Sequence, residues 1–481
     1  AFPSRALTVA SLTPTTVAAA KRDCKAEGIT NPYLLSDCVY DLGLTGGRAV
    51  CLGGAEARVQ AATGGPTATG LPGSSGALLP SSAAPPSSTP PTTATSTPVT
   101  VGSAPSVPPA VAVDASGTAY VVWQQSPTKL SFCKLASVAT RCSPVTLDVP
   151  DPVSDQFFGP PSVLLEPGHI YVLNVAIGGS DLDGINEFVS TDGGASFTLE
   201  PHAVGFVDNG EAAGPAVALP GGNFGAGYVI PGYNPAFQAN SLAAPTDESG
   251  ASAPPFATLN PVPASAYTIG NLGGAFGSQL VGSPGVLGVF RALPGKGSSS
   301  CPSTASAALV YAYAPVNAST TPAELSTSSG GGSSPWRPLT QADCDGTDPA
   351  VGGGPSGLGL LETNEAHVPT PGALVQYRHF SPSSGFGPAV TIATDESGSD
   401  GTLSQDSAGH IFATWLDDAT GVDLAYSSSG GATWSKPKIL FTNSGDPSGI
   451  SLLASAVGAS GKGWAVYSVG KREYAQQFSG S

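Results

Sequence analysis

Short hydrophobic runs alternate with tight glycine turns through the C-terminal three-quarters of the chain. The clearest units join a strand, a turn and a second strand, and they are residues 111–123, 162–174, 403–415 and 454–467. One glycine stands at each turn, weaker copies included: Gly117, Gly168, Gly221, Gly285, Gly357, Gly409 and Gly461. These glycines recur at intervals of about 50 to 70 residues, and such a period with several short strands per unit predicts an all-β fold, a β-propeller.

Seven repeat units predict seven blades, and six blades are the alternative if one weak copy is an insertion. The last unit offers only three strands and ends with residues 471–478. A propeller that does not close its ring leaves an open strand edge, which invites aggregation. We therefore expect the missing strand to come from residues near 98–101 or from another chain.

The first 62 residues are the only stretch with convincing helical signals. Thr16 is placed to cap a helix over residues 17–27, and two further helices fit residues 32–42 and 47–62. Cys24 and Cys38 fall on the first two helices. A disulfide between them would clamp a unit that is too small to bury much core.

Residues 63–106 are rich in Pro, Ser, Thr, Gly and Ala and carry almost no charge. This composition favours a flexible or O-glycosylated linker in an extended state. The alternative is an ordered arm held against its own propeller or against a neighbouring subunit. The chain is thus expected to divide into a helical module (1–62), this tract (63–106) and the propeller (107–481).

The composition favours a secreted protein. Charged residues make up only 11% of the chain, against roughly 25% in typical soluble domains. The sequence begins at Ala1 and contains no Met, so we expect that a secretory signal has been removed. The net charge of −16 repels phosphate and anionic lipid, and no apolar run reaches the about 20 residues that cross a bilayer. We therefore expect no nucleic acid partner and no membrane insertion.

The seven cysteines indicate disulfides in an oxidising compartment, because no Cys-x-x-Cys pair or zinc-spaced cluster occurs. Two further pairs are expected to tether loops of the propeller. The expected pairs are Cys24 with Cys38, Cys133 with Cys142, and Cys301 with Cys344. Cys51 is left over, and it is either a buried free thiol or an intermolecular link.

Two segments share a turn motif. Residues 190–197 read Ser-Thr-Asp-Gly-Gly-Ala-Ser-Phe, and residues 427–434 read Ser-Ser-Ser-Gly-Gly-Ala-Thr-Trp. Both resemble the Asp box, Ser-x-Asp-x-Gly-x-x-Trp/Phe, of sialidase-like (BNR) β-propellers, and a decayed third copy is expected at residues 326–336. In this motif a carboxylate or hydroxyl binds backbone N–H groups of its own turn, and the aromatic residue packs between blades. The motif positions are Ser190, Asp192, Gly194 and Phe197, and Ser427, Ser429, Gly431 and Trp434.

A second resemblance concerns residues 24–46, which read CKAEGITNPYLLSDCVYDLGLTG. They are similar to the short Cys-containing helical module that follows von Willebrand type D domains in bacterial surface proteins. This resemblance covers under a tenth of the chain. It implies that the neighbouring module is missing and that the chain is a processed fragment.

The likeness to sialidases raises the question of catalysis. Such enzymes need an arginine cluster for the substrate carboxylate, a Tyr nucleophile with a Glu partner, and an acid/base Asp. Only Arg291, Arg378 and Arg472 remain as candidates for the arginine triad. The string nearest to the family's Phe/Tyr-Arg-Ile-Pro motif, at residues 290–294, is imperfect and stands in the middle of the propeller. We therefore expect no sialidase activity, and other hydrolase or nucleotide-binding motifs do not occur.

In the sialidase-like fold, the ligand face lies opposite the Asp boxes and is built from loops that lead into each inner strand. Those loops are acidic here, and their acidic residues are Asp151, Asp155, Asp208, Glu211, Asp343, Asp345, Asp348, Asp395, Glu396, Asp400 and Asp446. A ring of negative potential is able to hold Ca²⁺ or a basic partner, and Asp343, Asp345 and Asp348 are the metal candidates. The favoured interpretation is that these Asp residues serve as turn and cap residues and that no cofactor is bound.

Together these patterns favour a non-catalytic extracellular or cell-surface structural protein. Its propeller would be a rigid block, and its N-terminal arm would mediate self-association into a filament, layer or matrix. The reasons are the missing blade strand, the spare Cys51 and the low charge. The alternatives are a glycan-binding, adhesive propeller and a sialidase-like glycoside hydrolase.

Overall fold

The computed structural model describes residues 96–479, with gaps. The gaps are residues 104–106, 127, 138, 150–159, 177–182, 201–203, 207–210, 213–215, 220–222, 230–234, 242–256, 259–266, 269–273, 281–284, 295–307, 316–336, 339–346, 365–373, 395–397, 418–420 and 443–449. The expected helices at 17–27, 32–42 and 47–62 lie outside the described residues, as do Cys24, Cys38 and Cys51.

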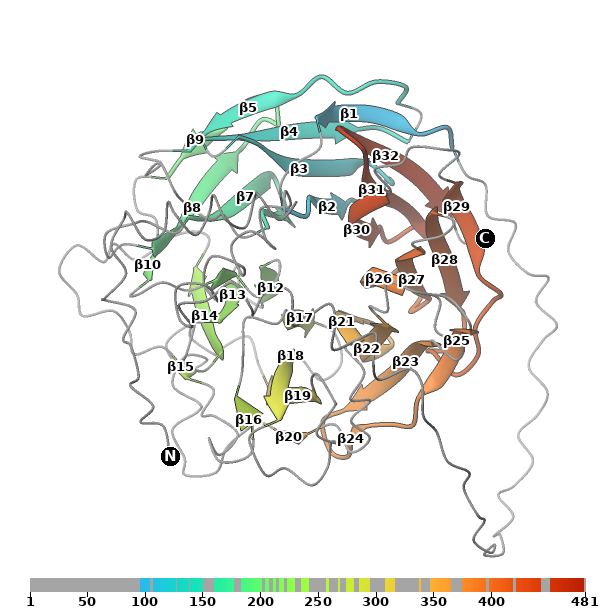
Figure 1. The fold of residues 1–481 in the computed structure, drawn as a ribbon. Coiled ribbons are helices and arrows are strands. Elements are labelled where there is room, and N and C mark those ends of the chain that lie inside the picture. The colour runs from blue at the N-terminus through green and yellow to red at the C-terminus, as the bar shows by residue number, and fades with distance from the viewer. Residues whose placement is uncertain are drawn as a thin grey trace, which may run out of the picture. The chain divides into compact units, whose positions relative to one another are not determined.

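The described residues form seven antiparallel sheets, and the fold is an all-β propeller (Figure 1). Innermost strands of successive sheets contact one another: β2 with β6, β12 with β17, β17 with β21, β21 with β26, β26 with β30, and β30 with β2. Between the second and third sheets, Ala216 N donates to Ser162 Oγ at 2.6 Å. The sequence favours seven blades over six. The seven sheets agree with this number, which stays a prediction.

The first three sheets follow the chain from its first repeat. The first contains β2 (Ala110–Val113), β3 (Ala119–Ser126), β4 (Lys129–Leu135) and β5 (Val145–Asp148). The second contains β6 (Ser162–Glu166), β7 (His169–Ala176), β8 (Asp183–Ser190), β9 (Thr198–Leu199) and β10 (Val204–Phe206). The third contains β11 (Glu211–Ala212), β12 (Val217–Leu219), β13 (Asn223–Val229), β14 (Pro235–Ser241) and β15 (Ala257–Thr258).

The next three sheets repeat the plan. The fourth contains β16 (Tyr267–Thr268), β17 (Gly274–Gln279), β18 (Gly285–Pro294), β19 (Ala308–Pro315) and β20 (Arg337–Pro338). The fifth contains β21 (Thr347–Gly354), β22 (Gly357–Asn364), β23 (Leu374–Ser381), β24 (Gly385–Phe386) and β25 (Val390–Thr394). The sixth contains β26 (Gly398–Gln405), β27 (Ile411–Asp417), β28 (Gly421–Ser427) and β29 (Lys438–Thr442).

The seventh sheet joins the two ends of the propeller. It contains β30 (Ile450–Val457), β31 (Lys462–Val469), β32 (Arg472–Ser479) and, outermost, β1 (Val99–Ser103). β1 runs antiparallel to β32, with Val99 opposite Ala475. Just before β1, Ser96 N donates to Gln477 O at 3.1 Å. The strand expected from residues near 98–101 is therefore supplied by the same chain, not by a neighbour.

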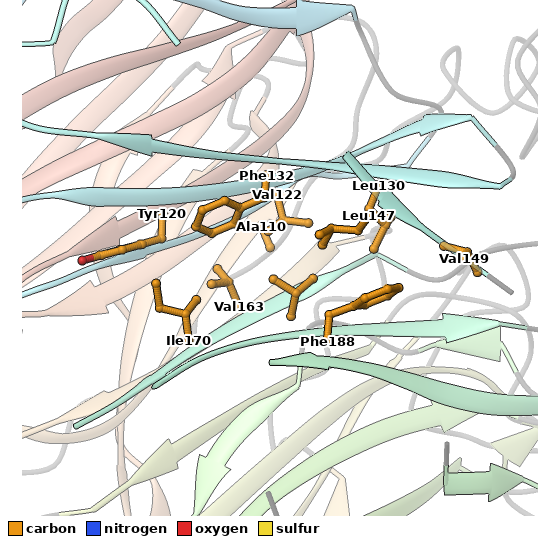
Figure 2. Packing of buried hydrophobic residues seen from close by; sticks show 11 residues of the cluster. Ala110, Tyr120, Val122, Leu130, Phe132, Leu147, Val149, Val163, Ile170 and Phe188 are labelled. Atoms are coloured by element: carbon orange, nitrogen blue, oxygen red, sulfur yellow. The ribbon is translucent and has the colours of Figure 1, made fainter. Parts of the chain in front are cut away.

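The core lies between the sheets, because alternate side chains of each strand face the two neighbouring sheets. Val122 and Phe132 of the first sheet pack against Val163, Ile170 and Phe188 of the second (Figure 2). The side chains that alternate with Val122 along β3 and with Phe132 along β4 point the other way and pack against the seventh sheet. Each such buried aliphatic or aromatic side chain contributes about 1.5–3 kcal/mol.

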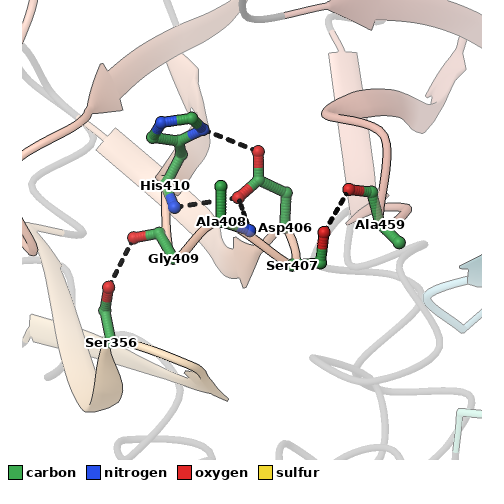
Figure 3. A network of polar contacts seen from close by, with 7 residues as sticks. All are labelled: Ser356, Asp406, Ser407, Ala408, Gly409, His410 and Ala459. Carbon is green, nitrogen blue, oxygen red and sulfur yellow. Dashed lines mark hydrogen bonds and ion pairs between the residues drawn. The ribbon is translucent and has the colours of Figure 1, made fainter.

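The turns between the first two strands of neighbouring sheets are linked to one another (Figure 3). Asp406 Oδ1 accepts hydrogen bonds from the N–H groups of Ala408 and His410, both at 2.9 Å, and so closes its own turn. Ser407 Oγ donates to Ala459 O of the next turn at 2.7 Å. Ser356 Oγ, from the preceding turn, donates to the carbonyl of Gly409 in the same way. The turns of the fifth, sixth and seventh sheets are therefore held together by direct hydrogen bonds.

Candidate functional site

The 190–197 turn lies between β8 and β9 and satisfies its own polar groups. Asp192 Oδ1 accepts the N–H groups of Ala195 and Ser196 at 2.9 and 3.0 Å, and Ser196 Oγ donates to Oδ2 at 2.6 Å. Ser190 Oγ accepts Gly194 N at 2.8 Å and donates to Asp192 Oδ1. These hydrogen bonds, first of all that from the Ser196 hydroxyl, hold the pKa of Asp192 well below its usual range. The carboxylate thus binds backbone and hydroxyl groups of its own turn.

The 427–434 turn reproduces this geometry without a carboxylate. Ser429 Oγ takes the place of the Asp oxygen and accepts Thr433 N at 2.8 Å. Ser427 Oγ accepts Gly431 N at 2.9 Å, as its counterpart does in the second sheet. Trp434 Nε1 donates back to Gly431 O at 3.1 Å. Both turns therefore organise backbone, and neither presents a free reactive group.

Each turn receives an aromatic ring from the preceding sheet. Phe132 of β4 packs against Gly194 and lies 4.7 Å from Phe197, measured between ring centroids. Tyr377 of β23 packs in the same way against Gly431 and lies 5.3 Å from Trp434. In both places a glycine is required, because a Cβ would collide with the ring. We call this arrangement the glycine–ring clasp.

A third clasp was not anticipated from the sequence. Gly385, with φ of 78°, follows the turn after β23, and its Cβ position would lie 2.6 Å from Tyr311 Oη of the fourth sheet. Phe386 packs against the same ring at 4.8 Å. The turn lacks the Asp but keeps the Ser-x-Ser-x-Gly spacing of the 427–434 turn at Ser381, Ser383 and Gly385, and its aromatic residue follows the glycine directly. The decayed copy expected at residues 326–336 lies outside the described residues.

The three candidate arginines lie in three different sheets. Arg291 lies in β18, opposite Leu309 of β19. Arg378 lies in β23 of the fifth sheet, opposite Leu360. Arg472 begins β32 of the seventh sheet and is exposed. Arg378 is buried whereas Arg472 is exposed, so these two guanidinium groups do not share one environment.

Arg378 is committed to a buried ion pair. Its Nε lies 2.7 Å from Glu362 Oε1, and both side chains are almost fully buried. The pair shares its face of the fifth sheet with Leu358, Leu360 and Phe380, which pack against the fourth sheet. Burying either charge alone would be costly, so each group neutralises the other inside the fold. The Arg378 guanidinium is therefore held by a carboxylate within the packing between the fourth and fifth sheets.

Other buried polar groups carry no sequence motif. Glu187 of β8 and Glu473 of β32 are buried, and desolvation raises the pKa of each to about 8. For Glu187 the carboxylate of Glu200 adds to the effect. Asn174 of β7 is fully buried, and its amide has no hydrogen-bond partner among the described residues. The alternation of hydrophobic and polar residues along a strand does not predict which polar residues are buried.

The acidic loops lie mostly outside the described residues. The exceptions are Glu211 in β11, Asp348 in β21 and Asp400 in β26, and Asp400 has a φ of 46°. Of the metal candidates, Asp343 and Asp345 lie outside the described residues. Among the residues that the structure describes, no group of three or more His, Cys, Asp or Glu residues is arranged to hold a metal ion.

One disulfide belongs to the described residues. Cys133 and Cys142, which the sequence analysis paired, are joined, and Cys133 is buried against the seventh sheet. Cys301 and Cys344 lie outside the described residues. In the described part of the chain there is no helix suited to crossing a membrane.

No protein-family model matches this chain, and no curated protein is significantly similar to it. Similar solved structures include an α-L-arabinanase of Penicillium chrysogenum, with 14% identity, 69% of this chain and 98% of that chain covered, and a TM-score of 0.44. An ulvan lyase has 9% identity, coverage of 80% and 94%, and a TM-score of 0.44. An α-L-arabinofuranosidase of Fusarium graminearum has 10% identity, coverage of 67% and 93%, and a TM-score of 0.41. We take neither activity nor substrate from these similarities.

Proposed function

We propose that this protein is a non-catalytic, extracellular structural protein. Its propeller serves as a rigid building block, and the residues before the propeller mediate self-association at a cell surface or in a matrix. The observation that carries the non-catalytic part is the buried pair between Arg378 and Glu362. A sialidase-type site needs its arginines free to meet a substrate carboxylate, and this one is already neutralised.

Two further features support the proposal. The disulfide between Cys133 and Cys142 fits an oxidising, extracellular compartment. The turns that resemble Asp boxes use their polar atoms on their own backbone. Because β1 already pairs with the edge of β32, that edge does not accept a strand from another copy of the chain. Contact between copies is assigned instead to residues 1–95, including the spare Cys51.

Size-exclusion chromatography with light scattering and negative-stain imaging of the full chain test the self-association. We expect discrete oligomers or filaments, and a strict monomer at all concentrations would overturn this part. A Cys51→Ser variant separates covalent from non-covalent association. A loss of disulfide-linked species on a non-reducing gel would assign Cys51 to an intermolecular bond.

Turnover of a fluorogenic sialoside tests the absence of catalysis. We expect none above buffer for the wild-type chain. Turnover that is lost in Arg291→Lys, with the fold retained by circular dichroism, would instead establish the hydrolase alternative. Binding of the monomeric propeller to a glycan array without turnover would favour the adhesive alternative.

A further inference from the structure

The seam that closes the ring contains a fully buried carboxyl group. Glu473 of β32 lies opposite Gly102 of β1 on one side and Ser468 of β31 on the other. Ser468 Oγ donates a hydrogen bond to Glu473 Oε2. Glu473 Oε1 has no hydrogen-bond partner among the described residues. The carboxyl group is therefore only half satisfied at the place where the first strand meets the last.

Apart from Ser468, the neighbours of Glu473 that the structure describes on its face of the sheet include apolar residues. It shares its face of β32 with Ala475, which packs in the cluster that contains Trp123 and Cys133 of the first sheet. A Cβ at Gly102 would lie 2.7 Å from the indole of Trp123, so the backbone of β1 lies directly on that ring. β1 and Trp123 together thus cover the carboxyl group, and undocking of β1 would expose it to water.

The charged groups around the seam are not placed to neutralise Glu473. Arg472, its neighbour in the chain, is exposed at the start of β32. On the first sheet, Lys129 Nζ lies 3.8 Å from Asp148 Oδ1, and both side chains are at least half exposed. Tyr467 lies on the other face of the seventh sheet, where burial, followed by the charges of Tyr474 and Glu473, raises its pKa far above the usual range.

The energetic consequence follows from the difference between the docked and undocked states. Burial raises the pKa of Glu473 to about 8, and the Ser468 hydrogen bond only partly opposes this effect. In water the group would titrate near its ordinary pKa of about 4.3. Below about pH 4.3 the carboxyl group is protonated in both states, so its burial does not weaken docking of β1. As the pH rises from there to about 8, the undocked state loses the proton first, and the free energy that favours docking falls progressively.

We propose that Glu473 couples ring closure to proton uptake: β1 docks fully only while this carboxyl group is protonated, so the closing strand opens more readily as the pH rises. The device acts locally, on a strand that is attached by one edge to β32.

Hydrogen exchange of the full chain at several pH values tests this proposal. Protection factors of the β1 amides, corrected for the intrinsic exchange rate, should fall about tenfold per pH unit between about pH 5 and 8 and then level off. In Glu473→Gln the same amides should show no such fall. Glu187→Gln is the matched control, because Glu187 is an equally buried carboxyl group in the second sheet. It should leave the pH dependence of β1 unchanged.

A second variant keeps the test decisive if Glu473→Gln does not fold. Ser468→Ala removes the hydrogen bond that lowers the pKa of Glu473, so protection should level off at a higher pH. A flat profile for the wild-type β1 amides would overturn the proposal. So would an equal slope in Glu473→Gln, or a levelling point that Ser468→Ala does not move.

Discussion

Two adjacent glycines in the 190–197 turn provide a matched pair of substitutions. Gly193 and Gly194 have φ values of 73° and 92°, so alanine is strained at both. A Cβ at Gly193 would find only Lys134 Nζ, at 3.5 Å, whereas a Cβ at Gly194 would lie 2.6 Å from Phe132 Cε1. The two alanine variants therefore share the backbone strain and differ by the collision with the ring.

The magnitudes follow from these two effects. A left-handed conformation costs an L-residue about 1–2 kcal/mol, and displacing a packed ring costs about 1–3 kcal/mol more. Gly193→Ala should therefore lower the free energy of unfolding by about 1–2 kcal/mol, and Gly194→Ala by about 2–5 kcal/mol. The 427–434 turn repeats the comparison, because a Cβ at Gly430 would be in loose contact and one at Gly431 would collide with Tyr377.

Equilibrium unfolding in urea measures the four variants against the wild type. Within each pair, the second glycine should be the more sensitive by about 1–3 kcal/mol. Adding Phe132→Leu to Gly194→Ala replaces the ring by a smaller side chain. The double variant should therefore recover part of the stability that Gly194→Ala loses. Equal losses at Gly193 and Gly194 would show that the clasp does not constrain the fold, and the reasoning would fail.

Three further predictions concern other features of the sheets. Arg378→Met should cost about 3–5 kcal/mol in denaturant unfolding because it removes the guanidinium that neutralises the buried Glu362 carboxylate; replacing both residues by apolar ones should cost less, and an equal cost would contradict the ion-pair argument. Cys142→Ser should destabilise by about 2–3 kcal/mol from the loss of a short disulfide loop; a thermal midpoint that matches that of the unreduced wild type would contradict this. Because the pKa of Asp192 is lowered, its contribution to stability is present at neutral pH and lost as the pH falls; the midpoints of wild type and Asp192→Asn should therefore converge in acid, and a constant difference would rule out this linkage.

Local patterns predicted much of the ring. The hairpins around Gly117, Gly168 and Gly409 are found where the repeat placed them, because each needs only a tight turn between two hydrophobic runs. The three-strand final unit was also informative. Its missing strand predicted a partner near residues 98–101, and β1 is that partner.

Contacts between sheets could not be predicted from local sequence patterns. The pairing of Glu362 with Arg378 depends on both residues facing the same neighbour, and alternation along a strand does not say which neighbour that is. The clasp between Gly385 and Tyr311 joins residues of two sheets, and its local signature is only the Ser-x-Ser-x-Gly part of the motif. For the same reason Arg378 was a candidate for binding a substrate carboxylate. The sequence shows that the residue is an arginine, but not that Glu362 is its buried partner.

The hydrogen bond from Gln477 N to Ser96 Oγ spans 381 residues of chain. A ribosome synthesises β1, the outermost strand of the seventh sheet, before the other described strands, and its pairing partner β32 after all of them. Until then the growing polypeptide is an open fan with a free edge at either side, exposed to chaperones and to misassociation. β32 is therefore indispensable, and a chain that stops before Arg472 should leave β1 unpaired and be degraded.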